Sequence, residues 1–135
     1  MSRLIERVTL GLFAAVAGGY AVLALLIPQR LARAVFGHAL APGAVLLHSM
    51  MGGMQLGLAL VALVCARSPK PPRTLVRAIA AGLVFTVAGP LFGTAMQQIP
   101  VPELQSYSPL LGFEALVALT LVATQLARRV QVLTP

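Results

Sequence analysis

A chain of 135 residues has room for one domain. Its composition excludes an ordinary soluble protein, because 59% of the residues are hydrophobic and only 10% are charged, whereas soluble domains have about 25% charged residues. The net charge of +7 does not indicate nucleic-acid binding, because the basic residues stand at the ends of apolar runs and form no stripe with interleaved aromatic residues. The single cysteine, Cys65, excludes an internal disulfide and a paired-thiol redox motif.

Four apolar runs are long enough to cross the roughly 30 Å of hydrocarbon in a bilayer, which takes about 20 helical residues. They cover residues 8–27, 43–66, 74–97 and 109–127. Helices are predicted because lipid cannot hydrogen-bond an open backbone, and the alternation typical of a membrane β-barrel strand is absent. The sequence therefore predicts an all-α fold, an integral membrane four-helix bundle that forms a single transmembrane domain over residues 1–135.

The first run follows the charged segment MSRLIER and ends at Pro28. A cleaved signal peptide also has a charged start and an apolar core, but this run is long for one and no small-residue cleavage site closes it. The segment PQRLARAVFG comes next, and it is mildly amphipathic and too short to cross a membrane. We expect it either to lie along the outer interface, with Arg30 and Arg33 reaching the headgroups, or to form a solvated loop.

Prolines mark the boundaries of the later runs. The second is entered through Pro42 and ends before RSPKPPR, which we expect to be a stiff, extended turn. The third contains Pro90, which predicts a kink, because proline cannot donate a hydrogen bond to the carbonyl of Thr86. We expect Pro109 in the first turn of the fourth helix.

The basic residues predict the orientation. Eight of the ten Lys and Arg residues lie in the N-terminal segment, the second connection and the C-terminal segment, which share one side of a four-span protein. Both termini are therefore predicted to be cytoplasmic. The chain is rich in Ala, Leu, Gly, Val and Arg and has one Lys and no Asn or Asp, which indicates a GC-rich bacterial gene and hence the bacterial cytoplasmic (inner) membrane.

Small residues recur at intervals of four in three of the runs, which places them on one face of each helix. In lipid, small residues let helix backbones approach closely. They predict close packing, either within this chain or against another protein. The glycines concerned are Gly11 and Gly19 in the first run, Gly53 and Gly57 in the second, and Gly89 and Gly93 in the third.

The stretch HSMMGGMQLG, residues 48–57, brings polar groups into the second run. With both termini inside, His48 lies about one and a half turns below the outer face. Glu114 lies at a similar depth in the fourth run. Because a carboxylate that faces lipid is costly, we expect these two side chains to pair in one outer-leaflet pocket. The residues expected on the wall of that pocket are Tyr20, Gln97 and Gln98.

Three interpretations of this pair remain open: a structural hydrogen bond that fixes helix orientation, a binding site for a ligand or partner, and acid–base chemistry. His48 and Glu114 supply too few ligands for a metal ion, and without any Asp the chain has no Ser–His–Asp set. We therefore predict no metal, no cofactor and no enzymatic activity.

Three stretches resemble in their layout the DoxX-like group of small four-span bacterial membrane proteins, particularly the DUF4345 family of unknown function: GLFAAVAGGYAVLALLIPQRLARAVFG, HSMMGGMQLGLALVAL and GFEALVALTLVA. The resemblance covers roughly residues 10–127. In that group an Arg often precedes the double glycine, a place that His48 holds here. Some members are associated with quinone or thiol redox complexes, so the resemblance implies a redox association, while the single Cys65 argues against a dithiol mechanism.

The predicted spans take up almost the whole chain, which favours a non-enzymatic role. The preferred interpretation is an accessory or stabilising subunit of a larger membrane complex, or a protein that binds a lipid-like molecule in its outer half. The expected partners are the lipid bilayer, other membrane subunits or further copies of this chain, and a lipid or a quinone. The alternative is a redox-linked, quinone-associated or proton-handling component that uses His48 and Glu114.

Overall fold

A computed structural model describes residues 2–96 and 101–133, and helices account for most of them. Four of the helices are long and apolar enough to cross a membrane, which confirms the predicted all-α fold with four spans. The helices are α1 (Ser2–Leu26), α2 (Pro28–Phe36), α3 (Pro42–Arg67), α4 (Arg73–Ala95) and α5 (Val101–Leu133).

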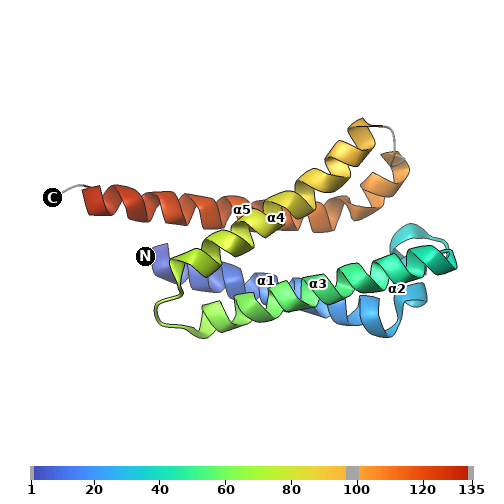
Figure 1. Cartoon of the computed structure of the whole chain (residues 1–135), viewed down its shortest axis with the longest axis horizontal. Coiled ribbons are helices and arrows are strands. Elements are labelled where there is room, and N and C mark those ends of the chain that lie inside the picture. Colours follow the sequence, from blue (N-terminus) through green and yellow to red (C-terminus); the bar gives the residue numbers. More distant parts are fainter. Residues whose placement is uncertain (1, 97–100, 134–135) are drawn as a thin grey trace.

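The long helices form two antiparallel pairs (Figure 1). Helix α1 packs along α3, and α4 packs along α5, while contacts between α1 and α5 join the two pairs. Helices α3 and α4 are connected by a short turn but make few contacts with each other, and they diverge away from that turn. The bundle is therefore closed at the end that carries both termini and opens between α3 and α4 toward the other end.

The core lies toward the closed end, where side chains from all four long helices meet. Leu10 and Phe13 of α1 are fully buried there. They pack with Ile79 and Leu83 of α4 and with Leu121 of α5. Many large apolar side chains are exposed on the outside of all four long helices, as expected of a bundle surrounded by lipid.

Close approach between α1 and α3 depends on Gly52. A Cβ atom at this position would lie 3.0 Å from the Cβ of Ala24 and 3.3 Å from the carbonyl oxygen of Ala21. Gly18 and Gly11 of α1 face alanines of α3 less tightly, because a Cβ atom at these positions would lie 3.5 Å and 3.8 Å from the nearest alanine Cβ. The two backbones therefore come nearest where Gly52 meets α1.

The prediction of packing within this chain is wrong for four glycines, because a Cβ at any of them would meet nothing within 4 Å, while packing of these glycines against another protein stays a prediction. Successive residues point about 100° apart around a helix, so a spacing of four fixes a common face without saying which way that face points. The surroundings of Gly93 lie outside the described part of the structure. The four outward-facing glycines are Gly19, Gly53, Gly57 and Gly89.

The segment after the first span is helical, so the expected alternative of a loop is wrong, and a position along the outer interface stays a prediction. Helix α2 begins with Pro28, ends at Phe36 and is capped by Gly37, whose φ of 77° is the left-handed conformation that glycine adopts readily. Gln29 holds the following loop through two hydrogen bonds with the backbone of Leu40, of 3.0 and 3.1 Å. Ala32 is buried, so α2 has one inward and one outward face.

The N-terminal half of α5 differs from the prediction. The helix begins at Val101, so Pro109 lies inside it rather than in its first turn. Most of the segment expected to be a connection is therefore helical, and α5 changes direction in this region (Figure 1). At the other end of the molecule, α1 begins at Ser2 and includes the charged segment that the prediction left outside the first span.

Candidate functional site

The polar contact in the middle of the bundle joins Gln55 of α3 to Glu114 of α5. The side-chain amide of Gln55 donates a hydrogen bond from Nε2 to Glu114 Oε1. Glu114 is 1% exposed, and its Oε2 has no hydrogen-bond partner among the described residues. A buried carboxyl group is costly without hydrogen bonds, so the amide of Gln55 is its main compensation.

The expected pairing of His48 with Glu114 is wrong. Because α5 begins at Val101, Glu114 lies roughly three and a half turns along its helix, as Gln55 does in α3. His48 lies only about half as far along α3. The depth estimate failed because it placed the start of the fourth helix at Pro109.

His48 instead belongs to an aromatic cluster that ties three helices together. Its ring meets Tyr20 of α1 edge-on, with ring centroids 6.1 Å apart, and Phe36 of α2 edge-on at 6.4 Å. The side chain is 7% exposed, and Nε2 has no hydrogen-bond partner among the described residues. Such edge-to-face contacts stabilise packing. Two other residues expected here, Gln97 and Gln98, lie outside the described residues.

A groove of about 560 Å³ runs between α3 and α4, where the two helices diverge. Most of its lining is apolar. Thr86 is one polar residue on its wall, but the Thr86 hydroxyl donates a hydrogen bond of 3.0 Å to the carbonyl of Gly82. Gln55 is the second polar residue on the wall of the groove, and its side chain is half-buried. The full lining is Met51, Met54, Gln55, Leu58, Gly82, Phe85, Thr86 and Pro90.

The amide of Gln55 gives this groove its chemical character. A glutamine side chain has two N–H donors and a carbonyl acceptor, and the bond to Glu114 uses one donor. The remaining donor and the acceptor can bind a carbonyl or hydroxyl group of a molecule in the groove. Among the residues that the structure describes, no group of three His, Cys, Asp or Glu side chains is placed to hold a metal ion.

A second polar cluster, at the closed end, was missed in the sequence. Glu6 of α1 is fully buried and forms an ion pair with Arg128 of α5. Gln125 Nε2 donates a 3.0 Å hydrogen bond to Glu6 Oε1. The prediction began the first span at residue 8 and so left Glu6 in the tail. The sequence signal for this cluster is Glu6 itself, an acidic residue between Arg3 and Arg7. Within a membrane bundle, a buried acidic side chain is stable only when it is paired with a basic or hydrogen-bonding partner.

The chain is a small four-span integral membrane protein. Comparison with protein-family models, with curated proteins and with solved structures finds no match. The resemblance to the DoxX-like group therefore stays a prediction. The features of the protein that bear on its function are therefore the groove and the two polar clusters.

Proposed function

We propose that the protein is non-enzymatic and binds a lipid-like molecule in the groove between α3 and α4. The observation that carries this proposal is the joint presence of an open apolar groove and one hydrogen-bonding side chain on its wall. Gln55 supplies that side chain, and its bond to Glu114 fixes the amide in place. A molecule with an apolar body and a carbonyl or hydroxyl group matches both features.

The walls of the groove favour an apolar ligand. Met51 and Met54 contribute flexible thioether side chains, which adapt to irregular shapes, and Phe85 is largely exposed on the opposite wall. A volume of about 560 Å³ lies within the usual range of small-molecule sites. Because the groove opens from the middle of two membrane spans, its ligand would enter sideways from the bilayer.

The bond between Gln55 and Glu114 supports specificity. An amide or carboxyl group in an apolar environment is costly when it lacks hydrogen-bond partners. A ligand that hydrogen-bonds to the free positions of Gln55 would lower this cost, whereas a plain hydrocarbon chain would not. We therefore expect the preferred ligand to carry a polar group part-way along an otherwise apolar body.

The test is to extract the intact protein together with its surrounding lipid in polymer nanodiscs and to identify the co-purifying lipids by mass spectrometry. Thr86→Phe fills the groove and should remove the specific ligand. Thr120→Phe is the matched control, because Thr120 also bonds its own helix backbone, through the carbonyl of Leu116 at 2.8 Å, but lies outside the groove lining. Equal retention of every lipid by both variants would contradict the proposal.

A quinone is one candidate for the ligand, because each quinone carbonyl can accept a hydrogen bond from the Gln55 amide. This keeps the redox-linked alternative within the same site. Direct proton transfer between His48 and Glu114 has no support, because these side chains belong to separate clusters. Quinones in the nanodisc extract, lost in Thr86→Phe, would identify the ligand class.

An accessory-subunit role rests on the surface of α3 next to the groove. Gly53 and Gly57 face outward beside the exposed side chains of Met50 and Leu60, which are outside the groove lining. Outward-facing small residues allow a second membrane helix to approach closely. In this role a second membrane protein, or another copy of the chain, would co-purify in the same extraction, and Gly57→Leu would release it.

A further inference from the structure

The end of the molecule that carries both termini is strongly basic. The N-terminal part of α1, the turn between α3 and α4, and the C-terminal part of α5 all meet there (Figure 1). Of the three acidic residues in the sequence, Glu103 and Glu114 belong to the half of α5 nearer its start, and Glu6 is already paired with Arg128. Most of the positive charge at this end is therefore not neutralised from within. The basic residues concerned are Arg3, Arg7, Arg67, Lys70, Arg73, Arg77, Arg128 and Arg129.

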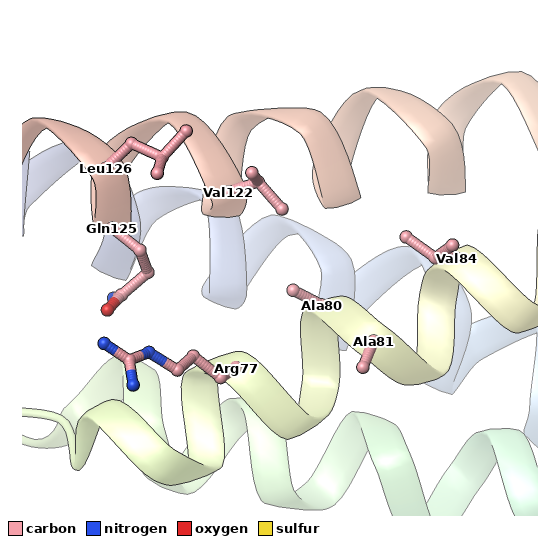
Figure 2. A pocket seen from close by; sticks show the side chains of 7 residues that line it. All are labelled: Arg77, Ala80, Ala81, Val84, Val122, Gln125 and Leu126. Carbon is pink, nitrogen blue, oxygen red and sulfur yellow. The ribbon is translucent and has the colours of Figure 1, made fainter.

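A groove of about 310 Å³ opens between α4 and α5 next to this basic end. Figure 2 shows that the side chains of Arg77 and Gln125 point toward one another at one end of the groove. Apolar side chains form the rest of the lining, with Leu126 and Val84 about half-exposed. The full lining is Arg77, Ala80, Ala81, Val84, Val122, Gln125 and Leu126.

Gln125 is the fixed part of the polar end. It is 7% exposed, and its amide is held by the hydrogen bond to Glu6, which in turn is paired with Arg128. Arg77 is exposed and comes from the first turns of α4. The groove thus has a cationic end beside a fixed amide and an apolar body that runs toward the middle of the membrane.

We infer that the groove between α4 and α5 binds an anionic phospholipid from the leaflet on the side of the termini. The Arg77 guanidinium would donate hydrogen bonds to the phosphate, a strong charge-assisted contact. One acyl chain would lie along Ala81, Val84 and Val122. Basic residues at a membrane surface attract anionic lipids in general. Here the apolar groove behind Arg77 adds a place for the chain, which favours a lipid over a soluble phosphate.

This inference is separate from the proposed function. The two grooves lie on different faces of α4, one lined by Gly82, Phe85 and Thr86, the other by Ala80, Ala81 and Val84. Lipid bound at Arg77 would raise the stability of the folded protein, whereas the ligand near Gln55 would be the molecule that the protein binds specifically. Either site can fail its test while the other passes.

The test measures the thermal unfolding of the purified, intact protein in a neutral detergent while lipid is added. Phosphatidylglycerol should raise the unfolding temperature at lower concentration than phosphatidylcholine with identical acyl chains. Arg77→Gln should weaken the phosphatidylglycerol effect roughly fivefold, the factor that corresponds to one basic contact near a membrane surface. Arg67→Gln removes the same charge from the same end of the molecule, outside the groove, and should have a much smaller effect.

A second variant tests the apolar half of the groove without a change of charge. Ala81 is exposed, so Ala81→Phe should fold normally while it blocks the place of the acyl chain and weakens phosphatidylglycerol binding. Glycerol phosphate, which has no acyl chain, should not reproduce the stabilisation. Equal losses in Arg77→Gln and Arg67→Gln, full binding by Ala81→Phe, or equal effects of the two lipids would each overturn the inference.

Discussion

At the scale of single residues, two groups of polar side chains inside the bundle connect different helices. Gln55 bonds to Glu114 in the middle of the bundle, and Glu6 binds both Gln125 and Arg128 at its closed end. Both acidic residues are buried. Breaking a buried polar pair leaves one group without compensation, which costs more than the pair contributes when intact.

Replacement of Glu114 tests this cost. Glu114→Gln keeps a hydrogen-bond acceptor for the Gln55 amide and should leave the free energy of unfolding nearly unchanged. Glu114→Leu leaves that amide unpaired and should destabilise the protein by about 1–3 kcal/mol. Unfolding of the purified variants by titration with a denaturing detergent measures both values. The double variant Gln55→Leu with Glu114→Leu should recover part of the loss, and strictly additive effects would contradict the pairing.

At the scale of helices, α1 and α3 are held together by small residues that face each other. Alanines on both helices and Gly52 allow the backbones to approach, and Gly18 and Ala59 extend this contact. Helices α3 and α4, although adjacent in the chain, lack such a seam and diverge. The difference explains why the groove forms between α3 and α4 and not between α1 and α3.

Neighbouring glycines in α3 provide a matched test of this packing. Gly52→Leu should destabilise the protein by about 1–3 kcal/mol, a typical cost of overpacking. The Cβ atom of the new side chain alone would lie 3.0 Å from the Cβ of Ala24. Gly53→Leu should have little effect in the monomer, because its side chain would point into open space. Thermal unfolding in detergent measures both. A larger loss in Gly53→Leu would mean that α3 is rotated from the orientation described.

At the scale of the whole molecule, the topology brings the three basic segments to one end (Figure 1). The loop after α2 lies at the opposite end, where it contains Ala39 and His38. Because basic residues are retained on the cytoplasmic side, the closed end of the bundle is expected to face the cytoplasm and the loop after α2 the outside.

Cysteine labelling in intact cells tests this orientation. The natural Cys65 is buried and would be replaced by alanine. A cysteine at Ala39, which is exposed, should react with a membrane-impermeant reagent added from outside. A cysteine at Lys70, exposed in the turn between α3 and α4, should react only after the membrane is opened. The reverse pattern would show that the orientation is inverted.

Four helical crossings of the membrane, and basic segments gathered at one end, follow from the amino-acid sequence without any structure. Apolar runs of sufficient length specify spans because an unsatisfied backbone is excluded from lipid. The segment PQRLARAVFG has an amphipathic pattern, and it forms helix α2, in which Ala32 is buried against the bundle. These properties depend on local composition, which can be read along the chain.

Which side chains meet is settled only in the folded molecule. Gln55 rather than His48 binds Glu114, and Gly52 rather than Gly53 packs on α1. Both outcomes depend on the rotation of each helix about its axis and on where α5 begins along the membrane normal. A shift of one residue turns a side chain by about 100° and moves it by about 1.5 Å. Hydropathy constrains neither quantity, because almost every side of these helices is apolar, so helix packing determines them.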